Sequence, residues 1–335
     1  MQPRAGSSLR ARSSHLSVAR TIKARVAARA YPQVYKVRER IPRYSLHEQA
    51  KTFSARARER GLGDVGLYYW YHTVDLGDGL VTPGLHDYRS KIDEFCFPRD
   101  MSGMNVLDVG SATGFFSFEF EKRGANVVSV EVPSLSEVDR FPYQDEARTA
   151  PKLAAMVAGH SSQSSDDFDT VFNASNSEDV YHYVLDGPFN FCREALGSQV
   201  ERRYASIYDL SPAALGVDKF DLVFLGDLLL HTMHPLTALA AVAPLCDGTL
   251  VISQHLPTSL GSRPAVLYVG GDNPIHDHST WWYPNLACFE QILKKLGFEA
   301  VSVVGRNVGA SRPGGVHYDR PILHASRDVV ARRHR

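Results

Sequence analysis

Residues 106–117 and the acid at position 131 combine residue types that can bind a cofactor. Asp108 ends an apolar run, and Gly110 and Gly114 follow it at a Gly-x-x-x-Gly spacing. Glycines at such a turn let a ligand approach bare backbone and a helix N-terminus. Glu131 comes 21 positions after Gly110, at the end of the next apolar run, which suits an acid that binds both hydroxyls of a ribose. We therefore expect cofactor contacts from Asp108, Gly110, Ser111, Gly114 and Glu131.

The turn distinguishes between two cofactors that carry a ribose. A dinucleotide fingerprint needs glycines at its first, third and sixth positions, which here hold Gly110, Ala112 and Phe115. Phe115 would crowd a pyrophosphate, so an oxidoreductase is disfavoured. S-adenosylmethionine has no phosphate, and Asp108 can then bind its ammonium group. The turn resembles the first motif of class I methyltransferases, with Ala112 in place of the middle glycine. A tight turn that binds no ligand is the alternative.

A second group of polar residues follows the apolar run 220–226. Ligands of doubly wound sheets bind beyond the carboxyl ends of the strands, so Gly226 to His231 should border the cofactor, as should Ile207 and Tyr208 after a neighbouring strand. His231 is either a general base for the acceptor or a histidine that holds its loop by hydrogen bonds. His231 and His234 have the spacing of a metal pair but no acid run nearby, so no metal is predicted.

Residues 65–84 contain four successive aromatic side chains followed by a histidine, a group that suits a binding wall. Trp70, Tyr71 and His72 precede an Asp-Gly turn signal at 78–79. The segment is interpreted either as a hydrophobic cap on the sheet or as a lid over the acceptor, and the two are compatible. We expect Trp70 and Tyr71 in the substrate pocket and His72 among the catalytic candidates.

Residues 272–283 form a second concentration of polar and aromatic side chains before a helix. His276 is a catalytic candidate, and Trp281 and Trp282 offer stacking surfaces for the acceptor. A metal bound by His276 and its neighbours is disfavoured, because successive residues of an extended segment point to opposite sides.

The apolar runs alternate with helical patterns, which predicts the elements that position these residues. The fold class is α/β, a Rossmann-like doubly wound sheet that is mostly parallel and ends in an antiparallel hairpin. Seven strands are expected at 104–109, 126–131, 203–208, 220–226, 248–253, 301–304 and 321–325, and helices at 115–123, 188–196, 235–245 and 284–296.

Composition indicates a globular cytoplasmic protein. The 335 residues are 44% hydrophobic and 22% charged, and no apolar run approaches the roughly 20 residues that cross a bilayer. Four scattered cysteines fit a reducing compartment. Residues 1–60 hold 15 Lys or Arg against three acids, and the rest of the chain is correspondingly acidic. The basic leader is a solvated arm, a nucleic-acid-binding arm or a transit sequence.

Three segments together resemble the tRNA wobble-uridine carboxymethyltransferase-like family of methyltransferases. They are the Trp-Tyr-His to Thr-Pro-Gly leader at 70–84, the His-x-x-x-Pro turn at 231–235 and the helix that ends near Phe298. The likeness covers roughly residues 65–326. It implies that Lys91, Gly110, Glu131 and Arg320 contact the sulfonium cofactor. We accordingly expect a basic arm or helix at 1–60, an aromatic cap segment at 61–103 and a class I methyltransferase domain at 104–328 with a long insert at 134–200.

The chain departs from that family at the residues that distinguish its cofactor. The tRNA enzyme holds the extra carboxylate of a carboxylated S-adenosylmethionine with a lysine, a tyrosine and an arginine. The matching positions here hold His72, Leu230 and Arg320. Leucine offers no hydrogen bond, and a poorly paired carboxylate costs about 1–3 kcal/mol. We therefore expect ordinary S-adenosylmethionine.

The acidic body disfavours a polyanionic acceptor, so we expect O- or N-methylation of a small or medium-sized metabolite by in-line displacement. Two alternatives stay open: a tRNA-modifying enzyme that binds tRNA through the basic arm, and a non-catalytic regulatory protein that binds the cofactor.

Overall fold

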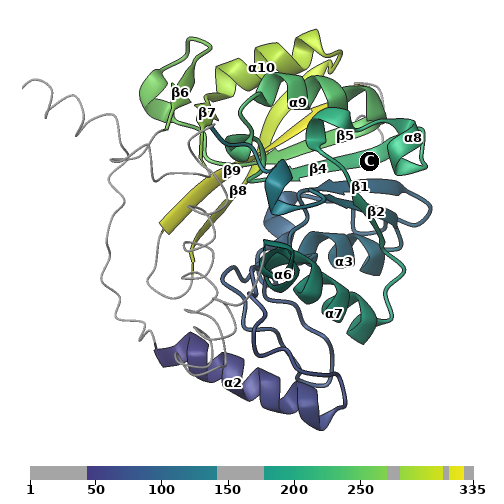
Figure 1. Ribbon diagram of the computed structural model, residues 1–335. Helices are drawn as coiled ribbons and strands as arrows, with labels where there is room; N and C mark the ends of the chain where they lie inside the picture. Colours follow the sequence, from purple (N-terminus) through teal and green to yellow (C-terminus); the bar gives the residue numbers. More distant parts are fainter. Residues whose placement is uncertain (1–43, 142–176, 270–279, 312–316, 328–335) are drawn as a thin grey trace, which may run out of the picture. The chain divides into compact units, whose positions relative to one another are not determined.

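Seven strands form one sheet in the computed structural model, which describes residues 44–141, 177–269, 280–311 and 317–327. The sheet order is β3-β2-β1-β4-β5-β9-β8 (Figure 1). The strands are β1 Asn105–Val109, β2 Asn126–Glu131, β3 Glu201–Tyr204, β4 Phe220–Gly226, β5 Cys246–Ser253, β8 Ala300–Ala310 and β9 His317–Ser326. The first five are parallel, while β9 pairs antiparallel with both β5 and β8. The predicted doubly wound sheet with a C-terminal hairpin is confirmed.

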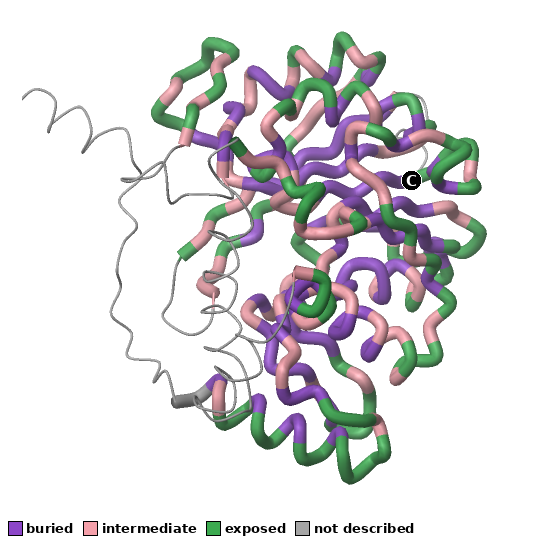
Figure 2. The backbone as a smooth tube through the Cα atoms, viewed as in Figure 1, coloured by how far each residue is buried: buried purple, intermediate pink, exposed green. Residues whose placement is uncertain are grey.

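The sheet is buried on both faces because its apolar side chains point alternately to two cores. Val106 belongs to one core, together with α2 Tyr44–Glu59, α3 Phe115–Lys122 and α7 Gly187–Leu196. Leu107, the next residue, belongs to the other core, with α8 Pro212–Leu215, α9 Pro235–Val242 and α10 Leu286–Lys295. Figure 2 shows the central strands buried along most of their length. Continuous apolar runs are typical of such doubly covered parallel strands.

Shorter elements connect these parts. A two-stranded sheet, which no pattern predicted, pairs β6 Val266–Tyr268 with β7 Trp282–Pro284. The helix α6 Ser177–Tyr181 runs through a π-helical turn at His182–Asp186 into α7. Single 3-10 turns occupy Ile92–Phe95, Leu135–Glu137, Ile207–Asp209, Leu229–His231, Ala243–Leu245 and Thr258–Leu260. Within the described ranges, no helix is both long enough and apolar enough to cross a membrane.

Several boundaries differ from the sequence prediction, and two of the differences have a clear local cause. The third strand ends at Tyr204 rather than at 208, because the Ser206 hydroxyl accepts the Tyr208 N–H and caps a 3-10 turn. The last helix begins at Leu286 rather than at 284, because the Asn285 side chain accepts the Cys288 N–H at 2.9 Å as its N-cap.

The helix α2 packs into the same core as the aromatic segment that follows it. Leu46, Ala50, Phe53 and Ala57 are buried along one face. The Phe53 ring lies edge-on at 5.1 Å from Trp70, and the Trp70 ring lies 5.6 Å from Phe191 of α7. The last part of the basic stretch 1–60 is therefore a packed helix, and residues 1–43 lie outside the described residues.

We expect the substitution Phe53→Ala to lower the free energy of unfolding by about 3–5 kcal/mol, because it removes a buried ring from the contact with Trp70. Thr52→Ala, on the exposed face of the same helix, should change it by less than about 0.5 kcal/mol. Urea unfolding measures both. A stable Phe53→Ala variant would show that α2 does not depend on this packing.

Candidate functional site

A cavity of about 300 Å³ runs along the carboxyl ends of the strands, across most of the sheet. This volume lies in the range of small-molecule sites, roughly 300–1,000 Å³. Its lining includes one residue from or directly after each of six adjacent strands, in sheet order Glu131, Asp108, Gly226, Ser253, Arg320 and Asn307. The cavity lies where a doubly wound sheet is expected to bind ligands, at the point where β1 lies between β2 and β4.

The turn after β1 has a left-handed backbone at three positions. Gly110 has φ 72°, Ala112 has φ 48° and Gly114 has φ 87°. A Cβ at Gly110 would lie 2.8 Å from the Leu228 side chain, so this glycine keeps the turn close to the loop after β4. A Cβ at Gly114 would lie 2.6 Å from the Phe118 ring. Gly110 lines the cavity, whereas Gly114 shapes the turn from outside the lining.

Glu131 is fixed by the backbone around it. One carboxylate oxygen accepts the Ala112 N–H at 3.0 Å, and the other accepts the Val132 N–H at 3.1 Å. A carboxylate oxygen has two lone pairs, so each can accept a further hydrogen bond. The Glu131 carboxylate lines the cavity and is able to receive two hydroxyl groups, as a ribose site requires.

Arg202 supports the same turn from behind, and sequence reasoning missed it. Its guanidinium donates to the Ser111 hydroxyl at 2.7 Å and to the Ala112 carbonyl at 3.3 Å. It also pairs with Asp186 at 3.5 Å and lies over the Phe189 ring, 4.1 Å from its centroid. Only 3% of the side chain is exposed. Two arginines are adjacent in β3, and nothing in the sequence distinguishes buried Arg202 from exposed Arg203.

Asp108 is a buried carboxyl group in the lining of the cavity. It accepts a hydrogen bond from the Ser117 hydroxyl at 2.6 Å. Burial raises the pKa of Asp108 to about 7, although the bond from Ser117 opposes the shift. The charge of this group therefore changes near neutral pH.

An ion pair lies toward the other end of the cavity. The Arg320 guanidinium pairs with the Asp227 carboxylate, donates to the Tyr88 hydroxyl at 3.3 Å and stacks 4.0 Å from the centroid of the Tyr318 ring. Burial raises the pKa of Asp227 to about 6, and Arg320 limits that rise. Arg320 was expected in the site from the family resemblance, and Asp227 lies within the stretch 226–231 that was expected to border the cofactor, whereas Tyr88 was not expected.

The three histidine candidates have different surroundings. His72 is buried, and burial, followed by the neighbouring His86 and Arg320, lowers its pKa well below the ordinary value. It is therefore neutral. His231 is exposed and lines the cavity from the 3-10 turn Leu229–His231. His276 lies outside the described residues.

Of the four aromatic residues expected in the substrate pocket, the structure places only Tyr71 in the cavity lining. Trp70 points into the core against Phe53, because neighbours in an extended segment face opposite sides. Trp281 is buried, and its backbone N–H donates to the Leu230 carbonyl. Trp282 donates its indole N–H to the Met233 carbonyl at 3.0 Å. All three tryptophans therefore lie outside the cavity lining: Trp70 packs in the core, and Trp281 and Trp282 hold neighbouring loops by hydrogen bonds.

Of four further cofactor candidates, two line the cavity and two do not. Tyr208 and Gly226 line the cavity, and the Tyr208 hydroxyl donates to Asp139, another lining residue. Ile207 is buried in the core that includes α9. The Lys91 ammonium donates to the Val308 carbonyl and lies outside the lining. Lys91 is thus bound to a backbone carbonyl and Ile207 is packed in the core, so neither lines the cavity.

Comparison with known proteins gives one family match. Residues 85–303 match the model of a family described as "Methyltransferase domain". No protein of curated function matches the chain.

Several solved structures are similar. The N-terminal domain of EvdMO1, crystallised with SAH and D-fucose, has a TM-score of 0.44 and 15% identity over 82% of this chain and 96% of that one. Magnesium protoporphyrin IX methyltransferase (ChlM) from Synechocystis PCC 6803, with bound SAM, has a TM-score of 0.36 and 13% identity over 96% and 100%. The O-methyltransferase NcsB1 from neocarzinostatin biosynthesis has a TM-score of 0.38 and 10% identity over 71% and 53%.

The support that Arg202 gives the turn can be measured through cofactor binding. We expect Arg202→Met to weaken binding of S-adenosylhomocysteine by roughly 5- to 50-fold, because the turn loses hydrogen bonds from a charged donor. Arg203→Met, which removes an exposed pair with Glu201, should bind as the wild type does. Calorimetric titration of proteins shown to be folded by circular dichroism checks both. Unchanged affinity in Arg202→Met would contradict the role of this side chain.

Proposed function

The chain belongs to the methyltransferase domain family, as an S-adenosylmethionine-dependent methyltransferase, and we propose that it methylates a hydroxyl or amino group of a small or medium-sized metabolite. One observation carries the proposal. The cavity that contains Gly110 and Glu131 is also lined by His72 and Arg320, which come from the segment before the sheet and from β9. The same lining therefore joins residues that suit a cofactor to residues that can contact a small acceptor.

The residues at the β2 and β1 end fit the cofactor. Glu131 has lone pairs available for the ribose hydroxyls, and Gly110 lets the nucleoside lie close to the backbone. The Asp108 carboxylate is a suitable partner for the methionine ammonium group. When bound, S-adenosylmethionine supplies an electrophilic methyl group on its sulfonium sulfur.

The cofactor is proposed to be the ordinary form rather than a carboxylated one. Arg320 is the residue that would hold an extra carboxylate, but its charge is already balanced by Asp227. Leu230 is buried and its side chain has no hydrogen-bonding group, and His72 is neutral. A second carboxylate would have to displace Asp227 from its partner, which is unfavourable in a buried site.

The proton of the acceptor is proposed to leave through His231. His72 is a poor base because burial and the charge of Arg320 oppose its protonation. His231 lines the cavity and is exposed, so it can pass a proton to water. His72 then remains neutral and orients the acceptor, while the cavity walls align it for in-line displacement.

The assignment to the wobble-uridine family and a tRNA acceptor remain the alternative within the same chemistry. They would depend on the basic residues of 1–43, which lie outside the described residues. The rest of the chain is acidic, and a cavity of about 300 Å³ suits a small acceptor better than a polynucleotide. A regulatory protein that binds the cofactor without turnover is the alternative of a different class.

Label transfer from methyl-labelled S-adenosylmethionine to a metabolite extract tests the function and the base together. We expect the wild type to label a small molecule, and His231→Gln to slow the transfer by about 100- to 10,000-fold with unchanged cofactor affinity. His234→Gln, three residues away and exposed, is the matched control. No labelled metabolite with the wild type would favour the regulatory alternative. Full activity of His231→Gln would show that another group takes the proton.

The raised pKa of Asp108 predicts how cofactor binding depends on pH. As the pH falls from 8 to 6, the carboxylate with a pKa of about 7 becomes protonated and no longer attracts the ammonium group. The affinity for S-adenosylhomocysteine should therefore fall by about tenfold, since about a tenth of the group is ionised one unit below its pKa.

Two variants check the assignment by calorimetry at several pH values. Asp108→Asn should bind weakly and lose this pH dependence. Ser117→Ala should move the midpoint to higher pH, because the Ser117 hydroxyl stabilises the charged form. A midpoint that does not respond to either substitution would assign the titration to another group.

A further inference from the structure

The part of the cavity that lies beyond Asp108, counted from Glu131 along the sheet order, is here called the acceptor end, and it combines aromatic walls with buried polar atoms. We propose that it binds a planar aromatic acceptor that carries a phenolic hydroxyl group. This inference rests on the proposed methyl transfer and names the class of its acceptor. The acceptor end is made up of His72, Tyr88, Phe95, Phe116, Phe224 and Asn307.

The strand order separates the acceptor end from the cofactor. Glu131 lies on β2 and Asp108 on β1, whereas Asn307 lies on β8 at the opposite edge of the sheet. A nucleoside held by Glu131 with its ammonium group at Asp108 covers β2 and β1. The cavity from β4, where Phe224 is the register partner of Asp108, to Asn307 of β8 is then left for the acceptor.

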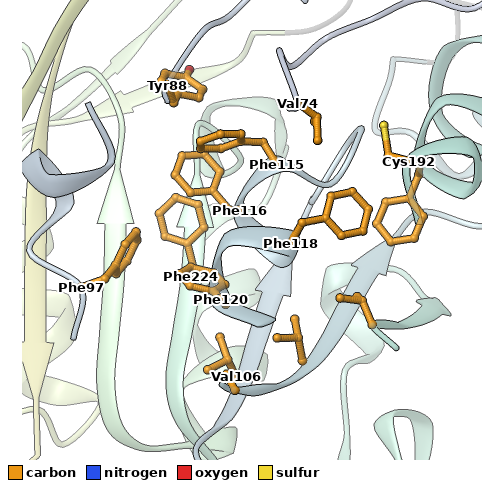
Figure 3. Close-up of a cluster of buried hydrophobic side chains, with 14 of the residues drawn as sticks. Val74, Tyr88, Phe97, Val106, Phe115, Phe116, Phe118, Phe120, Cys192 and Phe224 are labelled. Carbon is orange, nitrogen blue, oxygen red and sulfur yellow. The ribbon is translucent and has the colours of Figure 1, made fainter. Parts of the chain in front are cut away.

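Aromatic rings from separate elements meet in this wall. Phe116 lies in the first turn of α3, and its ring centroid lies 4.5 Å from that of Phe224 on β4, 5.0 Å from Phe95 and 5.3 Å from Tyr88. Figure 3 shows Tyr88, Phe115, Phe116 and Phe224 following one another in a row. Rings favour stacked or edge-on contacts with another flat ring. A polyol would leave several of its hydroxyl groups without partners against such a wall.

Two polar atoms of the acceptor end have no hydrogen-bond partner within the described part of the chain. They are the Asn307 side-chain oxygen and the His72 Nδ1 atom, in residues that are 1% and 4% exposed. Buried polar atoms of native proteins are almost always paired, so both suggest a ligand. The Asn307 oxygen accepts hydrogen bonds only, and it therefore calls for a donor such as a hydroxyl group.

The charges of the acceptor end favour a neutral ligand. His72 is neutral, and Asn307 is opposite Arg320 in the β8 and β9 pairing. Arg320 is the one Lys or Arg side chain among the described residues that line the cavity, and Asp227 balances its charge. Arg320 and Asp227 already pair with each other, so neither is left to bind an acceptor carboxylate or ammonium group. A phenolic hydroxyl, by contrast, can hydrogen-bond to the Asn307 oxygen and to His72 Nδ1.

Probe binding to the full chain saturated with S-adenosylhomocysteine tests the proposal. The probes are catechol, trans-cyclohexane-1,2-diol, which carries the same hydroxyl pair on a saturated ring, and D-fucose. We expect catechol to bind at least tenfold more tightly than the other two in calorimetric titration. Asn307→Leu should weaken catechol binding by about tenfold. Asn126→Leu, at an exposed position at the start of β2, is the matched control.

The titrations distinguish two kinds of failure. Absence of S-adenosylhomocysteine binding would contradict the proposed function itself. Normal S-adenosylhomocysteine binding with equal affinity for catechol and the saturated diol, or with a preference for fucose, would overturn the aromatic acceptor and leave methyl transfer intact. The comparison of probes on the wild-type chain needs no variant, so the proposal remains falsifiable if Asn307→Leu does not fold.

Discussion

The hydrogen bonds on both sides of Ala112 are the interaction on which the site depends. An alanine at φ 48° costs about 1–2 kcal/mol relative to ordinary backbone. Glu131 accepts its N–H and Arg202 binds its carbonyl oxygen, so two side chains of opposite charge hold the strained residue in place. The same bonds fix Glu131 beside the turn. The same two residues, one from β2 and one from β3, therefore fix the geometry of the turn and the position of the carboxylate that suits the cofactor.

The segment before the sheet belongs to the site as much as the sheet does. The His72 N–H donates to the Thr113 hydroxyl at 2.9 Å, which ties the segment to the cofactor turn. Gly84 lies so close that a Cβ there would be 2.1 Å from the His72 carbonyl carbon. This close contact helps to hold His72 and Tyr88 in the cavity lining, with His86 stacked on Tyr88. The helix α2 packs in the same core as this segment. The C-terminal part of the basic stretch 1–60 therefore supports the wall of the acceptor end.

Burial sets the protonation of the groups that face the cavity. It raises the pKa of Asp108 to about 7 and of Asp227 to about 6, and it keeps His72 neutral. The lining also contains the acidic side chains of Glu131, Glu137 and Asp139, which suit a cationic cofactor, while the neutral His72 suits an uncharged acceptor next to it. The Arg320 guanidinium is paired with Asp227, so it adds no unpaired positive charge to the cavity.

The sequence by itself determined the sheet, the glycine turn and Glu131, because these depend on local patterns: apolar runs, glycine spacing and an acid at a fixed distance along the chain. It also indicated Asp108, Tyr71, His72, His231 and Arg320, all of which line the cavity. Only the tertiary structure decided which face each side chain presents. Trp70 and Tyr71 are neighbours, yet one is in the core and the other in the cavity. Arg202 and Asn307 became visible only when distant strands were brought together, because their roles depend on burial and on partners remote in the chain.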